Sequence, residues 1–156
     1  MEIKNDWNDK NQHKLKILFV CYGNKCRSPM AEGIARKMLK GIANVESAGI
    51  AAWGSRASEE AIEVMKNKFG IDISEHKPKD IKNLSLNNFD YIVTMDSYID
   101  NYIKKYIKKY YHIESNKIIS WNIIDPYGSS IYDYEKCANI IKNQINDLLK
   151  KLEIIS

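Results

Sequence analysis

The sequence contains little of what marks several common classes of protein. Three cysteines in 156 residues, with no Cys-x-x-Cys pair, exclude a disulfide scaffold and give no zinc-site spacing. Only three of the 24 basic residues are arginines, and the lysines are scattered, so a nucleic-acid interface is not predicted. No apolar run approaches the roughly 18 residues of a membrane helix, and the first 14 residues lack a signal-peptide segment. We therefore expect a cytoplasmic protein with reduced thiols, and neither nucleic acid nor a membrane as its partner.

The composition that remains is that of one compact domain. Hydrophobic residues make up 44% and charged residues 28% of the chain, which are ordinary values for a globular protein. A chain of about 150 residues buries enough surface to form a core without disulfides or metals. The formal net charge of +4 supports only a mild attraction to anions. We expect residues 1–13 to form a flexible arm and residues 14–156 a single domain, present as a monomer.

Apolar runs alternate with amphipathic segments along the chain. The predicted strands are residues 15–21, 44–48, 89–95 and 117–120. The predicted helices are a segment that opens at Ser28-Pro29, with Ser28 as its cap, and residues 58–69, 97–111 and 134–152. This alternation predicts an α/β fold with a four-stranded parallel sheet and helices on both faces. Ligands of such sheets bind beyond the carboxyl ends of the strands, so a phosphate-binding loop is expected between the first strand and the first helix.

Two helices carry residues whose chemistry is ambiguous. In residues 97–111, neighbouring tyrosine and isoleucine pairs recur at helical spacing, and we expect this stripe to be the buried face of the helix. Cys137 lies on the apolar stripe of the last helix and is predicted to belong to the core.

The first loop reads Cys-Tyr-Gly-Asn-Lys-Cys-Arg-Ser over residues 21–28. Five residues between Cys21 and Arg27 can curl the backbone so that successive N–H groups point at one spot, and the following helix adds its positive end. A phosphate-sized dianion fits such a cradle. Cys21 would lie beneath it as a stabilised thiolate, and Arg27 would grip two phosphate oxygens. Gly23 and Asn24 tolerate the left-handed backbone angles that the curl requires.

Asp125 is the candidate proton donor that a displacement at phosphorus needs for its leaving group. It follows the fourth predicted strand and therefore lies at the same edge of the sheet as the first loop. Because Pro126 comes next, the backbone of Asp125 is kept out of helical geometry, which suits a side chain projecting from a loop.

Residues 21–32, which read Cys-Tyr-Gly-Asn-Lys-Cys-Arg-Ser-Pro-Met-Ala-Glu, resemble the signature of the low-molecular-weight protein tyrosine phosphatase family. The segment Asp125-Pro126-Tyr127 is similar to the acid loop of that family. Further matches in order are Ser47-Ala48-Gly49, Trp53, His76 and the segment from Phe89 to Asp96. The resemblance runs from Lys14 to about Leu152 and points to the bacterial branch, which also contains protein-arginine phosphatases.

The resemblance implies catalytic roles and no metal or other cofactor. Cys21 would form a phosphocysteine, Arg27 would bind the phosphoryl oxygens, and Asp125 would protonate the leaving group and then assist the attacking water. Ser28 would hydrogen-bond the thiolate, and Asn24 with His76 would support the shape of the loop.

The resemblance also implies a substrate cleft around the loop. Its expected residues are Tyr22, Gly23, Asn24, Lys25, Cys26, Ser28, Trp53 and Tyr127, with Trp53 and Tyr127 as aromatic walls. Inorganic phosphate and other oxyanions are expected to bind in the loop. In this family a disulfide such as Cys21–Cys26 protects the nucleophile from over-oxidation.

Two departures from the family pattern bear on the phosphorylated protein that is the expected substrate. Lys25 stands where the tyrosine phosphatases usually carry Ile and the arginine phosphatases carry Thr, and a cation there disfavours a guanidinium leaving group. Gly128 replaces a second Tyr of the acid loop, which resembles the arginine-phosphatase branch. Because Lys25 and Trp53 would face the substrate, phosphotyrosine is the prediction and phosphoarginine the alternative.

Two other functions fit the same loop less well. An arsenate reductase coupled to thioredoxin needs two further cysteines between the loop and the acid segment, and no cysteine lies between Cys26 and Cys137. A phosphoprotein-binding module or redox sensor without turnover predicts loss of Cys21, Arg27 or Asp125, and all three are present.

Overall fold

A computed structural model describes residues 14–155 as one α/β domain built on a four-stranded sheet. The strands are β1 (Leu15–Cys21), β2 (Ala43–Gly49), β3 (Tyr91–Thr94) and β4 (Ile118–Ser120). All pair in parallel, in the order β2-β1-β3-β4. This confirms the predicted parallel sheet, whereas the arm predicted over residues 1–13 lies outside the described residues.

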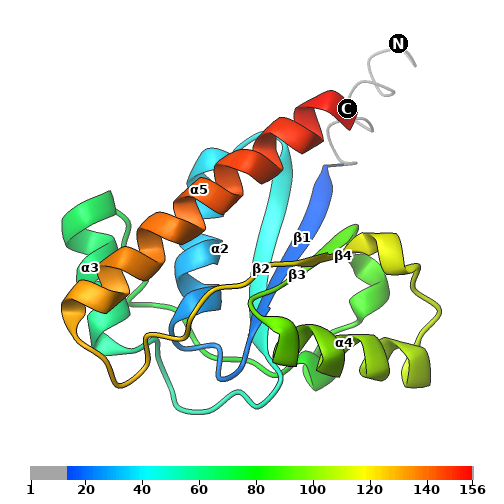
Figure 1. Ribbon diagram of the computed structural model, residues 1–156, viewed down its shortest axis with the longest axis horizontal. Coiled ribbons are helices and arrows are strands. Elements are labelled where there is room, and N and C mark those ends of the chain that lie inside the picture. The colour runs from blue at the N-terminus through cyan, green and yellow to red at the C-terminus, as the bar shows by residue number, and fades with distance from the viewer. Residues whose placement is uncertain (1–13, 156) are drawn as a thin grey trace, which may run out of the picture.

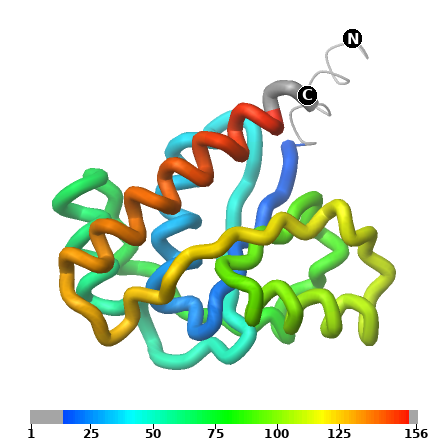
Figure 2. Tube along the Cα trace, in the orientation of Figure 1, coloured from blue at the N-terminus to red at the C-terminus, as the bar shows by residue number. Residues whose placement is uncertain are grey.

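Helices cover both faces of the sheet (Figure 1). They are α2 (Arg27–Met38), α3 (Glu59–Phe69), α4 (Ser97–Tyr110) and α5 (Ile131–Ile155), with 3₁₀ turns η1 (Ile81–Asn83), η2 (Leu86–Asn88) and η3 (Ser115–Lys117). Helix α5 runs diagonally past α3 and α2, as the trace in Figure 2 shows. None of the helices within residues 14–155 combines the length and the apolar character needed to cross a bilayer.

Strand β1 lies at the centre of the sheet and contributes to two separate cores. Because successive side chains of a strand point to opposite faces, Ile17 and Phe19 pack with residues of α2, α3 and α5, whereas Leu18 and Val20 pack with residues of α4 and the 3₁₀ turns. All four side chains are fully buried. This two-sided burial fixes β1, and with it the position at which the first loop begins.

From β1 the chain continues to β2 on one side of the sheet, and it then crosses back to β3 and β4 on the other side of β1. Its neighbours are β2 on one side and β3 on the other, so the loops that follow β1 and β3 diverge at this point. Crevices at such switch points are the usual ligand sites of open parallel sheets. The loop after β1 and the segment after β4 both lie at this carboxyl edge.

Some element boundaries differ from the sequence prediction. Helix α2 begins at Arg27, so Pro29 is its third residue, and Ser28 is not its cap. Cys26 occupies the cap position without a side-chain hydrogen bond to the helix. Helix α5 begins at Ile131, three residues before the predicted start, where the Ser130 hydroxyl accepts a hydrogen bond from the Asp133 amide.

The tyrosines of α4 are not its buried face. The inner stripe consists of Ile99, Ile103 and Ile107, whereas Tyr98 and Tyr110 are 64% and 60% exposed. Tyr102 and Tyr106 are half-buried and stack with ring centroids 6.4 Å apart along the border. Neighbouring helical positions are rotated by about 100°, so the apolar isoleucines turn inward and the amphipathic tyrosines remain at the margin.

Candidate active site

The loop between β1 and α2 curls tightly over the end of β2. Asn24 has a left-handed backbone with φ of 58°, as the sequence led us to expect at this position. Gly23, for which the same geometry was expected, does not have a positive φ. Gly49, the last residue of β2, lets the loop approach closely, because an added Cβ would lie 2.6 Å from the Tyr22 carbonyl oxygen and 2.9 Å from the Asn24 nitrogen. The shape of the loop therefore depends on Gly49, a residue of β2 and not of the loop itself.

Asn24 holds the loop from inside. Its side chain is fully buried and donates from Nδ2 to Ser28 Oγ at 2.8 Å and to Ser47 Oγ at 3.0 Å. Its Oδ1 accepts from the Lys79 amide at 2.9 Å, and its carbonyl oxygen lies 2.9 Å from His76 Nε2. Because a carbonyl only accepts, His76 Nε2 carries the proton of this bond. These contacts join the loop to β2, α2 and the segment before η1.

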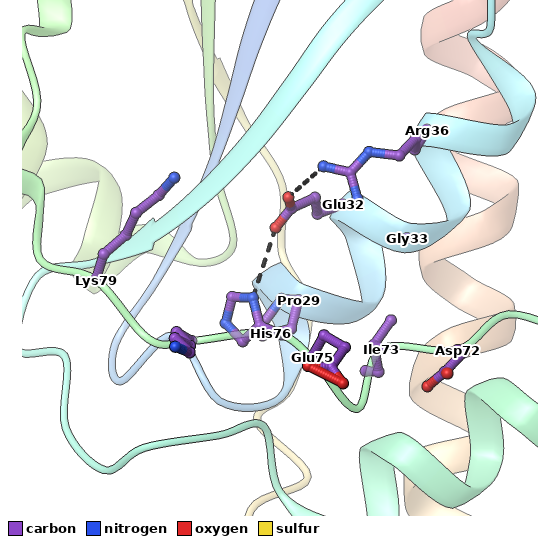
Figure 3. Close-up of a pocket in the computed structure, with 10 residues that line it drawn as sticks. Pro29, Glu32, Gly33, Arg36, Asp72, Ile73, Glu75, His76 and Lys79 are labelled. Carbon is purple, nitrogen blue, oxygen red and sulfur yellow. Dashed lines mark hydrogen bonds and ion pairs between the residues drawn. The ribbon is translucent and has the colours of Figure 1, made fainter.

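A second polar layer lies behind Asn24, around a cavity of about 300 Å³ (Figure 3). Ser47 donates to Glu32 Oε1 at 2.5 Å, and Glu32 Oε2 accepts from Arg36 Nη2 at 2.6 Å. His76 Nδ1 lies 3.8 Å from Glu32 Oε1. Burial is the main cause that lowers the pKa of His76, so the neutral imidazole is favoured and the Asn24 carbonyl keeps a directed donor.

Cys21 lies at the bottom of the loop. Its side chain is 3% exposed, and its Sγ is 2.9 Å from Ser28 Oγ. The Ser28 hydroxyl thus contacts the thiol and Asn24, which explains why it is not available to cap α2. The Cys26 side chain at the cap position makes no hydrogen bond to the start of α2, and uncapped backbone N–H groups at a helix start can bind an anion.

Arg27 is held in place by two hydrogen bonds and one longer ion pair, all to residues that follow β3 and β4. Its Nη1 donates to Asp96 Oδ2 at 2.6 Å and to the Ile123 carbonyl at 2.8 Å, and its Nη2 lies 3.7 Å from Asp125 Oδ2. Burial opposes its charge, but the hydrogen bond to Asp96 and the nearby negative groups raise the pKa of Arg27 overall. Its Nε is buried and has no hydrogen-bond partner among residues 14–155. A buried donor of this kind is costly, which points to an oxyanion as its partner in the working protein.

Aromatic side chains flank the opening above Cys21. Trp53 and Tyr127 meet edge to face with ring centroids 5.7 Å apart, and they are 48% and 54% exposed. Lys25 Nζ lies 4.3 Å from the centre of the Trp53 ring and donates to the Arg56 carbonyl at 2.7 Å. The Lys25 ammonium is therefore tied to the rim beside Trp53.

Asp125 reaches the opening from the segment after β4. Its Oδ1 accepts from the Tyr127 amide at 3.1 Å, while its carboxylate stays 45% exposed. This short turn directs the carboxylate toward Arg27 and leaves it accessible for proton transfer.

The three cysteines are free thiols in different surroundings. Cys26 Sγ lies 3.3 Å from Tyr134 Oη and 3.4 Å from Ser58 Oγ, and burial raises the pKa of Cys26. Burial raises the pKa of Cys137 to about 12, and this thiol belongs to the core as predicted. Cys26 and Cys137 are therefore protonated near neutral pH, unlike the thiolate that a phosphoryl transfer requires.

The structure gathers the predicted site residues around one cavity of about 190 Å³. All the residues that line it are predicted ones: Cys21, Tyr22, Gly23, Lys25, Cys26, Arg27, Trp53, Asp125 and Tyr127. Asn24, Ser28 and His76 lie behind the loop and make the supporting contacts described above. Within residues 14–155, no group of three or more His, Cys, Asp or Glu side chains is placed to hold a metal ion.

Sequence reasoning did not assign a role to Asp96, Glu32 or Ser47. Asp96 both caps α4, accepting from the Ile99 amide at 2.9 Å, and binds Arg27. An Asp directly after a buried strand and before an amphipathic helix signals such a cap at the carboxyl edge. Glu32 and Ser47 carry no comparable signal, because their contacts join different elements.

Known proteins resemble this chain in sequence and in fold. The family described as "Low molecular weight phosphotyrosine protein phosphatase" matches residues 16–154. The chain is 32% identical over 144 residues to the Ralstonia nicotianae protein "Probable low molecular weight protein-tyrosine-phosphatase EpsP", covering 89% of this chain and 97% of that protein. It is 36% identical over 136 residues to a Staphylococcus aureus "Arsenate reductase", covering 86% and 95%.

A solved structure shows the same likeness in three dimensions. It is the "YwlE arginine phosphatase from Geobacillus stearothermophilus", with a TM-score of 0.80, 29% sequence identity and coverage of 90% of this chain and 94% of that one. Family match, relatives and fold agree over nearly the whole described chain. The protein therefore belongs to the low molecular weight phosphotyrosine protein phosphatase family.

Proposed function

We propose that the protein is a metal-independent phosphatase that hydrolyses phosphotyrosine in proteins through a phosphocysteine intermediate. One observation carries this proposal: the Cys21 thiol, the Asp125 carboxylate and a buried Arg27 line a single cavity, and the Arg27 Nε has no partner in the part of the chain that the structure describes. A phosphoryl group supplies an acceptor for that donor while it faces the sulfur.

In the first step, the thiolate of Cys21 attacks phosphorus, so that an S–P bond forms as the P–O bond of the substrate breaks. Arg27 and the loop N–H groups stabilise the charge on the non-bridging oxygens. The protonated Asp125 gives its proton to the departing oxygen, which leaves as a neutral phenol. The contact between Arg27 and Asp96 fixes the guanidinium in place before substrate arrives.

In the second step, water attacks the phosphocysteine and the S–P bond breaks. Asp125, now a carboxylate, takes a proton from the water, and the product is inorganic phosphate. The electron pair returns to sulfur, where the Ser28 hydroxyl at 2.9 Å stabilises the restored thiolate.

The walls of the opening support phosphotyrosine as the substrate. Trp53 and Tyr127 contact each other edge to face at the opening, and both line the cavity, so a flat phenyl ring can pack against this aromatic pair. The Lys25 ammonium at the rim adds a positive charge close to the leaving group. This charge favours a phenyl ring and disfavours a second cation such as a guanidinium.

Protein-arginine phosphatase activity is the second candidate. It is favoured by Gly128, which has φ of 81° in the acid loop and stands where the tyrosine phosphatases carry a second Tyr. The likeness to an arginine phosphatase structure also supports it. Arsenate reduction is disfavoured in spite of the identity to arsenate reductases, because no cysteine lies between Cys26 and Cys137 to pass on a disulfide. The free thiols fit the proposed cytoplasmic location.

The test is hydrolysis of phosphotyrosine and phosphoarginine peptides of the same sequence, side by side in the presence of a chelator. Cys21→Ser is the inactive variant, and Cys137→Ser is its matched control because that thiol lies in the core. We expect wild type and Cys137→Ser to release phosphate preferentially from phosphotyrosine, and Cys21→Ser to release none. Preference for phosphoarginine would replace the substrate assignment, and absence of Cys21-dependent release from both peptides would refute the phosphatase.

A further inference from the structure

Asp100 is a buried carboxylate outside the active-site cavity. It lies in the first turn of α4 and is 7% exposed. Its Oδ1 accepts hydrogen bonds from Ser120 Oγ at 2.6 Å and from Thr94 Oγ1 at 3.1 Å. Its Oδ2 lies 2.8 Å from Lys104 Nζ. One oxygen atom of α4 thus joins two strands of the sheet.

Thr94 and Ser120 are the last residues of β3 and β4, and they are partners in the register of these strands. Strand β4 has only three residues and lies at the edge of the sheet, so few backbone hydrogen bonds hold it. The shared carboxylate oxygen adds a side-chain connection at the pair from which both chains leave the sheet. It therefore sets how the two departing segments lie relative to each other.

Both segments lead directly to Arg27. Two residues after Thr94 comes Asp96, whose carboxylate binds Arg27 Nη1, and three residues after Ser120 comes Ile123, whose carbonyl accepts from the same nitrogen. The Ile123 amide also donates to the Met95 carbonyl at 2.8 Å, so the segments stay paired beyond the strands. The two groups that fix the guanidinium thus lie only two and three residues past the pair that Asp100 joins.

We propose that Asp100 is a positioning residue, which sets the orientation of Arg27 for phosphate binding by joining Thr94 and Ser120. The inference rests on the proposed function in so far as Arg27 is the phosphate-binding group. Asp100 does not touch the substrate and acts through the two segments that hold Arg27.

The hydrogen-bond acceptor matters here more than the charge. Lys104 is 49% exposed and pairs with Oδ2, the oxygen that does not contact the strands. Asparagine in place of Asp100 keeps the Oδ1 acceptor for both hydroxyls, whereas alanine removes it and leaves the buried Thr94 hydroxyl with only a weak contact to the Ile119 carbonyl. The two substitutions therefore separate the joining function from the charge.

The experiment compares phosphate affinity with thermal stability in the full chain. Binding of inorganic phosphate is measured by calorimetry for wild type, Asp100→Ala, Asp100→Asn and Lys104→Met. The matched control is Asp90→Ala, because Asp90 Oδ2 accepts from the Lys16 amide at 2.8 Å and so joins β3 to β1 at the opposite edge of the sheet. If a carboxylate at either end of the strands is purely structural, its removal lowers the melting temperature without a specific loss of phosphate binding.

We expect Asp100→Ala to weaken phosphate binding by about tenfold, because small displacements of an oriented clamp have large effects. Asp100→Asn and Lys104→Met should bind phosphate like wild type, and Asp90→Ala should lose stability but not phosphate affinity. Wild-type affinity in Asp100→Ala would overturn the inference and leave the proposed function standing. Absence of phosphate binding in wild type would overturn the proposed function itself, and the inference with it.

A second variant covers the case in which Asp100→Ala does not fold. Ser120→Ala removes only the 2.6 Å hydrogen bond at an exposed position. It should weaken phosphate binding in the same direction and by a smaller factor. Unchanged affinity in a folded Ser120→Ala protein would likewise count against the inference.

Discussion

The Sγ of Cys21 lies 2.9 Å from the Oγ of Ser28, and both groups are buried. In the proposed mechanism this hydroxyl stabilises the sulfur when it leaves phosphorus. We expect Ser28→Ala to lower kcat by about 10–100-fold, the effect of losing one hydrogen bond to a charged group. Hydrolysis of the phosphocysteine should become rate-limiting, so that rapid-quench measurements show a burst of the released phenol.

The same variant must be separated from a change in the shape of the loop. Ser28→Ala also removes one partner of Asn24, but Asn24 retains its contacts with Ser47, Lys79 and His76. The affinity for inorganic phosphate should therefore change much less than kcat. A large loss of phosphate affinity without a burst would assign Ser28 to the loop rather than to the chemistry.

Asp125→Ala tests the proton donor. We expect a loss of about 10²–10⁴ in rate for aryl phosphates with poor leaving groups, the usual contribution of a positioned general acid. The loss should shrink as the leaving group becomes more acidic, because a stable phenolate needs no proton. The measurement is kcat for a series of aryl phosphates, with Asp133→Ala as a control on an exposed aspartate of the same region. An Asp125→Ala rate that equals wild type on the poorest leaving group contradicts the assignment.

Local patterns were sufficient to predict much of the fold. Alternating apolar and amphipathic segments predicted the four strands, and the helix predicted over residues 58–69 corresponds to α3. The strand prediction was too long for β3, whose hydrogen-bonded part covers only residues 91–94. Its ladder with β1 covers residues 91–94 and its ladder with β4 only residues 92–94, and these limits depend on tertiary neighbours.

The candidate site was predictable where its residues are consecutive and less so where they meet across the fold. Residues 21–28 carry their own pattern, but Arg27 and Asp96 are 69 positions apart in the sequence and meet only through the order of the strands. The cap predicted for Ser28 was wrong because its hydroxyl has better partners in Cys21 and Asn24. A residue's local preference is overridden when tertiary partners satisfy the same atom.

Gly49→Ala tests the close approach of the loop to β2. An added Cβ would lie 2.6 Å from the Tyr22 carbonyl and 2.9 Å from the Asn24 nitrogen, which are backbone atoms that cannot move without reshaping the loop. We expect phosphate binding and turnover to fall by about 10²-fold or more, since the oriented amides are displaced. Calorimetric titration with phosphate measures this directly.

The matched control for that change is Gly33→Ala. Its added Cβ would meet only side-chain methyl groups, at 3.1–3.2 Å, and alanine favours the interior of a helix. Phosphate affinity should therefore stay at the wild-type level. Equal effects of the two substitutions would show that the contact with the loop is not what makes Gly49 necessary.

The pH dependence of stability should report on His76. Burial, the largest cause, lowers its folded-state pKa below the usual value of about 6.5, although the Asn24 carbonyl and Glu32 oppose the shift. The unfolded chain then binds more protons than the folded one as the pH falls below about 6.5, and the free energy of unfolding decreases through that window. The stabilisation is fully present above about pH 6.5 and is lost as pH falls toward the folded pKa.

His76→Gln isolates this effect, because the glutamine Nε2 can donate to the Asn24 carbonyl but does not titrate. Urea unfolding of both proteins from pH 5 to pH 8 measures the difference. We expect the wild-type free energy of unfolding to fall more steeply than that of His76→Gln below about pH 6.5, and the two to run parallel above it. Parallel curves over the whole range would mean that His76 keeps its usual pKa in the folded protein. A wild-type curve that rises as the pH falls would mean that the carboxylate of Glu32 outweighs burial.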